Sequence, residues 1–318
     1  MFIVRYRAIF YTFSAILVAA SIAAVAVWGL NLGIDFKGGS LLEVAYKNGR
    51  PTQIAVQNAI APLGIPASVL PSETNGYDIR TATLSDSQKK GIISALSALE
   101  PESTSSMPIT ISGTQAMAVV STPSMTVVGE NSIGPTLGTE AAKKSIVAIL
   151  LVIAAIVLFI AWAFRKVSEP VSSWKYGIVA VIDLTHNIII PLGVFAVLGH
   201  FAGYEVDTLF VTALLVVLGF SVHDTIVVFD RIRENLRLSS AAKPFAETVG
   251  LSISQTVVRS INTSLVVLFA LIVLYFVGGS TTQHFSLALI IGIAAGTYAS
   301  ICLGSPLLVT LEKWQKKK

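Results

Sequence analysis

Cysteine and charge are both scarce in this chain of 318 residues. Its one cysteine, Cys302, excludes an internal disulfide and a multi-cysteine metal site. Charged residues make up 13% of the chain and hydrophobic residues 53%, whereas about a quarter of the residues of a soluble globular domain are charged. This shortage of charge indicates that lipid, rather than water, surrounds much of the protein.

Six apolar stretches are long enough to be transmembrane helices, since a helix needs about 20 mainly apolar residues to cross the hydrocarbon core. They are residues 8–30, 146–164, 176–199, 209–229, 261–277 and 285–308. The first follows Arg5 and Arg7, as the apolar part of a signal peptide would. Its apolar run is longer than the usual 7–15 residues of such a peptide, so we predict an uncleaved first helix.

Lysine and arginine are missing from two short connections, residues 200–207 and 278–284. The basic residues near the predicted spans lie at the opposite ends, at Arg5, Arg7, Arg165, Lys166, Lys175, Arg231, Arg233, Arg237, Lys243, Arg259, Lys313, Lys316, Lys317 and Lys318. Because Lys and Arg near a membrane gather on its cytoplasmic side, we predict that both termini are cytoplasmic. The net charge of +4 is therefore interpreted as a topology signal, and not as a sign of nucleic-acid binding.

The segment between the first two spans, residues 31–144, has the patterns of a soluble domain outside the cytoplasm. Strands are predicted at 41–46, 67–71 and 77–84, helices at 52–63 and 85–99, and β-rich fragments at 110–112 and 125–128, with a Ser/Pro-rich loop at 101–108. The order strand, helix, strand, strand, helix, strand is that of the ferredoxin-like α+β unit. Because a fold does not fix a function, a structural cap without activity remains an open interpretation of this domain.

Two glycine-containing motifs flank this segment. The first, residues 33–40, places Asp35 beside Gly38 and Gly39 and predicts a tight turn in which the Asp35 side chain bonds backbone amides. A phosphate-binding loop is the alternative, but the P-loop spacing is absent. The second motif contains Gly134, Pro135 and Gly138 and predicts a bent start to the second span.

Three ionisable residues are predicted to lie inside the membrane at similar depth. Asp224 lies seven residues before Arg231 and Asp183 eight residues after Lys175, which places them about 10–12 Å inside the cytoplasmic boundary. Arg259 starts the fifth span from the same side. A carboxylate near the bilayer centre costs about 2.5–3.5 kcal/mol, so we predict a proton relay; a fixed ion pair that holds the bundle together is the alternative.

His186 and Asn187 follow Asp183 by three and four residues, on the same helical face. Asp183, His186, His223 and Asp224 are ligand types that suit zinc. However, the adjacent His223 and Asp224 point about 100° apart on a helix, and no His-Glu-x-x-His pattern is present. We therefore predict no metal site and no cofactor.

Small residues recur at every fourth position of the sixth span. They are Ala288, Gly292, Gly296, Ser300 and Gly304. Such a ladder allows two helix backbones to approach closely. The sequence leaves open whether the partner helix belongs to this chain or to another subunit.

Taken together, these motifs resemble the SecF group of the SecD/SecF family, within the RND superfamily. The resemblance depends on Asp-Phe-x-Gly-Gly at 35–39, Gly-Pro-x-Leu-Gly at 134–138 and Asp-Thr-Ile-Val-Val-Phe-Asp-Arg-Ile-Arg-Glu-Asn at 224–235. It extends to 254–256, Arg259 and 296–298. In that family the pair at positions 186 and 187 is usually His-Asp, so Asn187 is a departure, and Asp183 is a candidate to replace the missing carboxylate.

The resemblance implies half of an RND-type transporter, built as an α-helical membrane bundle with the outer α+β domain. Its predicted parts are a stub with the first helix at 1–30, the outer domain at 31–144, five helices within 145–311 and a basic tail at 312–318. It implies a complex with SecD in a bacterial-type cytoplasmic membrane that acts with SecYEG on exported polypeptides.

The same resemblance implies a motor that uses the proton gradient and catalyses no covalent reaction. Asp224 would carry the proton with the help of Asp183, Arg259 and His186, and protonation would weaken its attraction to Arg259. An RND-like exporter of small molecules or lipids and a structural assembly factor are the alternatives.

Overall fold

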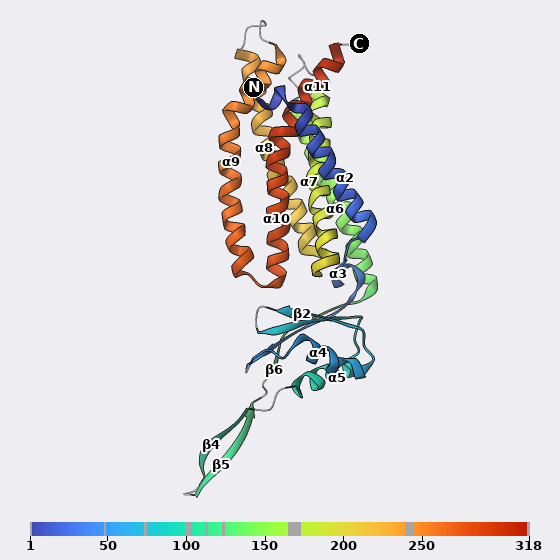
Figure 1. Cartoon of the computed structure of the whole chain (residues 1–318), viewed down its shortest axis with the longest axis vertical. Helices are drawn as coiled ribbons and strands as arrows, with labels where there is room; N and C mark the ends of the chain where they lie inside the picture. Colours follow the sequence, from blue (N-terminus) through green and yellow to red (C-terminus); the bar gives the residue numbers. More distant parts are fainter. Residues whose placement is uncertain are drawn as a thin grey trace. The chain divides into compact units, whose positions relative to one another are not determined.

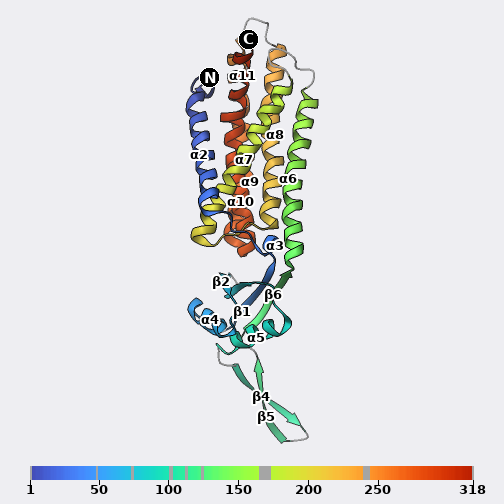
Figure 2. The same ribbon diagram turned by 90° about the vertical axis from the view of Figure 1, so that its right-hand side faces the viewer.

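The computed structural model describes residues 2–47, 49–72, 75–99, 103–111, 114–122, 125–164, 173–238 and 244–316 (Figures 1 and 2). The chain divides into two compact units. The first unit comprises Met1–Asn31 with Lys143–Lys318, and the second is Leu32–Ala142. Five basic residues used to predict the orientation lie outside the described residues, at Arg165, Lys166, Lys243, Lys317 and Lys318.

The first unit is a helical bundle. Its helices are α1 (Phe2–Arg5), α2 (Arg7–Trp28), α6 (Pro135–Ala163, which begins in the second unit), α7 (Ser173–Ala202), α8 (Thr208–Leu238), α9 (Phe245–Val277), α10 (Ser280–Ala299), the π-helical turn η2 (Ser300–Gly304) and α11 (Ser305–Lys316). α10 packs against α7, α8 and α9, and α2 packs against α7. Six helices in the described part of the chain are long and apolar enough to cross a membrane, as the sequence predicted.

The fifth of these helices is much longer than predicted. α9 begins at Phe245, whereas the apolar run begins at residue 261. The early turns of α9 place hydroxyl residues on its buried face, at Thr248, Ser252, Thr256, Ser260 and Ser264. A search for apolar runs passes over these turns, because their buried face is polar.

The hydroxyls of α9 bond mainly to their own helix. Ser252 Oγ donates to Thr248 O at 2.7 Å, Thr256 Oγ1 to Ser252 O at 2.9 Å, and Ser264 Oγ to Ser260 O at 2.8 Å. This i to i−4 bonding satisfies a buried hydroxyl without a partner from another helix. One further polar contact toward α8 is the bond from Asn235 Nδ2 to Ser252 Oγ, at 2.8 Å.

The second unit is built on an antiparallel sheet with the strand order β2-β3-β1-β6. Its elements are α3 (Ile34–Lys37), β1 (Gly39–Tyr46), α4 (Gln53–Ile60), η1 (Ala61–Leu63), β2 (Ala67–Ser72), β3 (Gly76–Thr81), α5 (Asp86–Ser97) and β6 (Met125–Ile133). Thr52 caps α4, and Ser85 and Gln88 form a capping box on α5. Val56 and Ile60 of α4 and Ile92 and Leu96 of α5 share one buried core with the sheet.

A separate two-stranded sheet lies between α5 and β6 in the sequence. β4 (Ser103–Ile111) pairs with β5 (Thr114–Thr122), from Ser103 opposite Thr122 to Ile111 opposite Thr114. The prediction of a loop at 101–108 was therefore wrong for residues 103–108. Both strands of such a ribbon are edges, and an edge strand tolerates the missing N–H of Pro108; Pro101 and Ser112 lie outside the described residues.

The two glycine motifs, predicted as separate features, lie against each other. Gly38 has φ 76° and ψ 159°, and a Cβ atom there would lie 2.7 Å from Cα and 2.8 Å from N of Pro135. A Cβ atom on Gly138 would lie 2.8 Å from the backbone N of Gly38. The two backbones therefore touch where only glycine leaves room.

Candidate functional site

A cluster of buried polar side chains lies inside the bundle, which we call the intramembrane polar cluster. Its members come from α7, α8, α9 and the α10–η2 segment, and they are Asp183, His186, Asn187, Ser221, Asp224, Thr225, Ser260, Ser264, Ser300 and the half-buried Thr297. Asp183 is 1% exposed and Asp224 2% exposed. Both predicted acids therefore lie in the interior of this unit.

Helical geometry divides the cluster into two parts. Ser221 and Thr225 are four residues apart and share one face of α8, whereas Asp224 precedes Thr225 directly. Adjacent residues on a helix point about 100° apart. Thr225 therefore meets Asp183 of α7, while Asp224 meets Ser264 of α9.

Hydroxyl groups hold one side of the Asp183 carboxylate. Thr225 Oγ1 donates to Asp183 Oδ2 at 2.8 Å, and the Ser300 hydroxyl lies 2.9 Å from Thr225 Oγ1. Asp183 Oδ1 is buried and makes no hydrogen bond within the described residues. The carboxyl group therefore keeps one oxygen open to bind a proton.

The Asp224 carboxylate also faces hydroxyl groups. Ser264 Oγ lies 3.5 Å from Asp224 Oδ2 and only 2.6 Å from Thr297 Oγ1. On its other side, His223 Nδ1 lies 4.0 Å from Asp224 Oδ1. In the part of the chain that the structure describes, Asp224 forms no ion pair with a lysine or an arginine.

The predicted pairing of Arg259 with Asp224 is not formed, and this part of the prediction was wrong. Arg259 is exposed and has no ion pair among the described residues. Ser260 faces the interior, so its neighbour Arg259 points about 100° away from that face. Depth in the membrane was predicted from sequence spacing, but the direction of the side chain was not.

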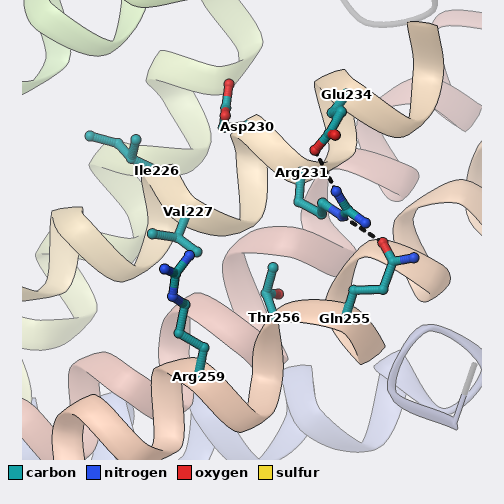
Figure 3. A pocket seen from close by; sticks show the side chains of 8 residues that line it. All are labelled: Ile226, Val227, Asp230, Arg231, Glu234, Gln255, Thr256 and Arg259. Atoms are coloured by element: carbon teal, nitrogen blue, oxygen red, sulfur yellow. Dashed lines mark hydrogen bonds and ion pairs between the residues drawn. The ribbon is translucent and has the colours of Figure 1, made fainter. Parts of the chain in front are cut away.

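Arg259 instead lines a pocket of about 370 Å³ between α8 and α9 (Figure 3). The pocket is lined by Ile226, Val227, Asp230, Arg231, Glu234, Gln255, Thr256 and Arg259. Arg231 bonds to Glu234 and donates from Nε to Gln255 Oε1 at 2.7 Å. In Figure 3 the Arg259 side chain extends toward Val227, away from that network.

His186 is fixed through Asn187. Asn187 Nδ2 donates to Ser221 Oγ at 2.5 Å, which turns its Oδ1 toward His186 Nδ1 at 3.1 Å. An amide oxygen only accepts, so His186 Nδ1 carries the hydrogen in this arrangement. His186 Nε2 is buried without a partner in the described residues, which makes it a free proton acceptor within the cluster.

The small-residue ladder of α10 packs within this chain, which answers the question that the sequence left open. A Cβ atom on Gly296 would lie 3.0 Å from Ser221 Cβ and 3.5 Å from Asn187 Nδ2. A Cβ atom on Gly304 would lie 3.6 Å from the Asp183 carboxyl carbon, and Gly292 lies against Val217. The ladder therefore brings α10 and η2 close enough for Ser300 to reach the acid.

A second group of charges lies in the Leu32–Ala142 unit. Glu43 and Asp78 are directly opposite each other on β1 and β3. Burial raises the pKa of Glu43, and the nearby Asp78 charge raises this pKa further, while Arg80 opposes the shift. This pair was not predicted from the sequence. A pair of like charges on facing strands becomes apparent once the strand register is known.

The residues that the sequence analysis missed are mainly the hydroxyls around the two acids. Ser221, Thr225, Ser264 and Thr297 are common in helices of every kind, so residue type alone gives no signal. The sequence feature that marks them is a spacing of three or four residues from another hydroxyl residue: Ser221 from Thr225, Ser264 from Ser260 and Thr297 from Ser300. Within the described ranges, no three His, Cys, Asp or Glu residues are placed to hold a metal ion.

The Thr225 hydroxyl is expected to stabilise the bundle through Asp183. Thr225→Val keeps the branched shape but removes the donor, so we expect the free energy of unfolding to fall by about 1–3 kcal/mol. Thr225→Ser keeps the donor and should lose less. Thermal unfolding in mild detergent measures this; Thr212→Val is the control, because exposed Thr212 bonds its own helix at Thr208 O. Equal losses for Thr225→Val and Thr212→Val would contradict the assignment.

The chain matches a known family over most of its length. Residues 114–314 match the family described as protein export membrane protein SecD/SecF, C-terminal. Residues 24–49, which include Gly38 and Gly39, match the SecD/SecF GG motif.

Two curated relatives are similar over nearly the whole chain. The protein translocase subunit SecF of Thermobaculum terrenum is 41% identical, with 99% of this chain and 94% of the relative covered. The protein translocase subunit SecF of Anaerolinea thermophila is 34% identical, with 96% and 92% covered.

Solved structures of SecDF are also similar. The translocon-associated membrane protein SecDF from Thermus thermophilus matches with a TM-score of 0.73 and 28% identity, over 96% of this chain. SecDF in its super-membrane-facing form matches with a TM-score of 0.64. The chain spans 37% of the first SecDF chain and 38% of the second, and the helices fit an RND-like membrane fold.

Proposed function

This chain belongs to the SecD/SecF family of protein-export membrane proteins, and we propose that it is a SecF-like subunit that uses the proton gradient to assist export. It is a multi-pass membrane protein with a Sec export accessory role. The chain spans 94% of the SecF relative from Thermobaculum terrenum, but only 37% of the first SecDF chain. We propose that SecD is its partner, and that the two act with SecYEG on exported polypeptides.

We propose the following arrangement in the membrane. Residues 31–144 form an extracytoplasmic, ferredoxin-like domain, which is supported by the strand order β2-β3-β1-β6 with α4 and α5 packed in one core. Both termini are cytoplasmic, in a bacterial-type inner membrane, which is supported by the basic residues at one set of helix ends.

One observation carries the proton-coupled mechanism. Asp224 is buried in a membrane span among hydroxyls, and among the described residues no lysine or arginine forms an ion pair with it. A permanently charged carboxylate in that place would be costly. Alternate binding and release of a proton removes that cost for part of each cycle, so Asp224 is proposed as the proton carrier.

The proposed coupling works through helix packing. A proton on Asp224 removes the charge that attracts the Ser264 and Thr297 hydroxyls, which changes how α8 fits against α9 and α10. Asp183 and His186 are proposed as the companion relay groups. Arg259 is proposed to act from the pocket in Figure 3 when α8 and α9 shift, and not through a standing ion pair with Asp224.

The energy available sets a limit on what this motor does. One proton moved through 100 mV supplies about 2.3 kcal/mol. That amount biases the position of a domain by more than tenfold, since about 1.4 kcal/mol corresponds to a factor of ten. It is too small for a single proton to unfold a stable substrate domain.

An ionophore tests the proposed function directly. In vesicles that contain the channel, the chain and its partner, the chain should raise the rate of export, and a proton ionophore should remove that increase. Vesicles that lack the chain are the control for effects of the ionophore on the channel itself. An increase that persists after the proton gradient has collapsed would exclude proton coupling.

A further inference from the structure

His223 is an ionisable side chain on the open face of a membrane span. Its side chain is 71% exposed, whereas that of the adjacent Asp224 is 3% exposed. His223 lies eight residues before Arg231, about 12 Å along the helix from that residue. An ionisable group at such a position is costly in lipid and is a candidate functional residue by default.

The open face around His223 is otherwise small or apolar. Val216 and Gly219 are exposed on the same side of α8, about two turns and one turn before His223 respectively, and nothing lies within 4 Å of the Cβ position of Gly219. On this exposed side of α8, His223 is therefore the polar side chain at the depth of Asp224. Its ring is exposed on the open face, and its Nδ1 atom lies 4.0 Å from the buried Asp224 Oδ1.

We propose that His223 delivers protons to Asp224 from the open face of α8. This inference rests on the proposed function, because it requires Asp224 to be the proton carrier. In the delivery step the imidazolium Nδ1–H passes its proton to Asp224 Oδ1, which leaves a neutral imidazole and a neutral carboxylic acid. The ring then takes up another proton from water that reaches its exposed side.

The geometry favours delivery from this side. The two atoms are 4.0 Å apart, so a small side-chain movement or one water molecule brings them within the 2.7–3.2 Å of a hydrogen bond. The opposite side of Asp224 is closed by Ser264, whose hydroxyl is already shared with Thr297 and with Ser260 O. Imidazole is also the side chain that ordinarily changes charge between pH 5 and 8.

Other ionisable groups on the helices around α8 face elsewhere. α7 contributes Asp183 and His186, which are buried on the Thr225 side of α8, and it has Lys175 and His200 near its two ends. α9 contributes Arg259, which lines the pocket beyond Ile226 and Val227. The charged or histidine residue within the described α10 is His284, at the far end of that helix. Asp224 is thus the acidic group that His223 approaches.

Chemical rescue provides the test. In vesicles with the complete complex, His223→Ala should slow proton-driven export about tenfold and flatten its dependence on pH, and free imidazole should restore the rate. His200→Ala is the matched control, because His200 is also exposed and its ring contacts the aromatic rings of Trp28 and Phe201; it should export normally. Asp224→Asn should stay inactive with imidazole present.

The possible outcomes separate this inference from the proposed function. Normal export and an unchanged pH profile in His223→Ala would overturn the delivery role and leave Asp224 as carrier. Loss of export that imidazole does not restore would also overturn it, since His223 would then be structural. If His223→Ala fails to assemble, His223→Gln, which keeps a polar side chain, should assemble and show a flattened pH profile; a normal profile would overturn the proposal. Normal export by Asp224→Asn would reject the proposed function itself.

Discussion

Asp224→Asn is expected to leave the complex assembled and to abolish the proton-dependent part of export. Asparagine has nearly the same shape as aspartate, keeps an oxygen for the Ser264 hydroxyl and is neutral like the protonated acid, so the bundle should assemble but stay in the arrangement of the protonated state. It cannot bind and release a proton near neutral pH. The measurement is the rate of export in vesicles with and without an imposed proton gradient, alongside copurification of the partner.

Asp230→Asn is the matched control for this experiment. Asp230 lies on the same helix, six residues farther along, and its side chain is 61% exposed and 3.6 Å from Arg233. An exposed ion pair of this kind contributes about 0–1 kcal/mol, so the variant should export normally. If Asp224→Asn responds to the proton gradient as the wild type does, Asp224 has no place in the mechanism.

Gly38→Ala is expected to lower the free energy of unfolding more than Gly29→Ala, although each substitution adds only one methyl group. With φ 76° and ψ 159°, Gly38 occupies a backbone region that is essentially restricted to glycine, at a cost of about 1–3 kcal/mol for another residue. The added methyl group would also lie 2.7 Å from the Cα atom of Pro135, and backbone cannot swing aside as a side chain can. We expect a total loss of at least about 3 kcal/mol.

Gly29→Ala separates the two contributions. Gly29 has φ 69° and ψ −177°, close to the conformation of Gly38, but nothing lies within 4 Å of its Cβ position. Gly29→Ala should therefore show only the backbone cost, and Gly38→Ala that cost plus the clash. Thermal unfolding of the purified protein gives both values. Equal losses of unfolding free energy in the two variants would show that the contact between the glycine motifs does not contribute to stability.

The sequence predicted the features that depend on position along one chain. Long apolar runs located the six helices, and counting from basic residues placed Asp183 and Asp224 inside spans. The pattern of strands and helices in the Leu32–Ala142 unit was also largely predicted, because alternation and capping residues are local signals. These features require no knowledge of which helices are neighbours.

Features that depend on rotation and on neighbours were not predicted. Arg259 was expected beside Asp224 because both lie at similar depth, but the direction in which a side chain points decides the contact, and Ser260 took that place. The contact between Gly38 and Pro135 joins residues nearly a hundred positions apart. The start of α9 was misplaced, since hydrophobicity does not reveal a buried face made of hydroxyls.

The self-satisfied hydroxyls of α9 have a mechanical consequence. Since Ser252, Thr256 and Ser264 each keep a hydrogen bond within their own helix, α9 can slide along a neighbouring helix while most of these bonds stay intact. Such a slide would have to break the contacts between helices. These are the bonds from Arg231 and Asn235 of α8 to Gln255 and Ser252 of α9, and the contacts of Ser264 with Asp224 and Thr297. One of these contacts involves Asp224, the proton carrier of the proposed mechanism, so in that mechanism protonation also changes how firmly α8 holds α9 against sliding.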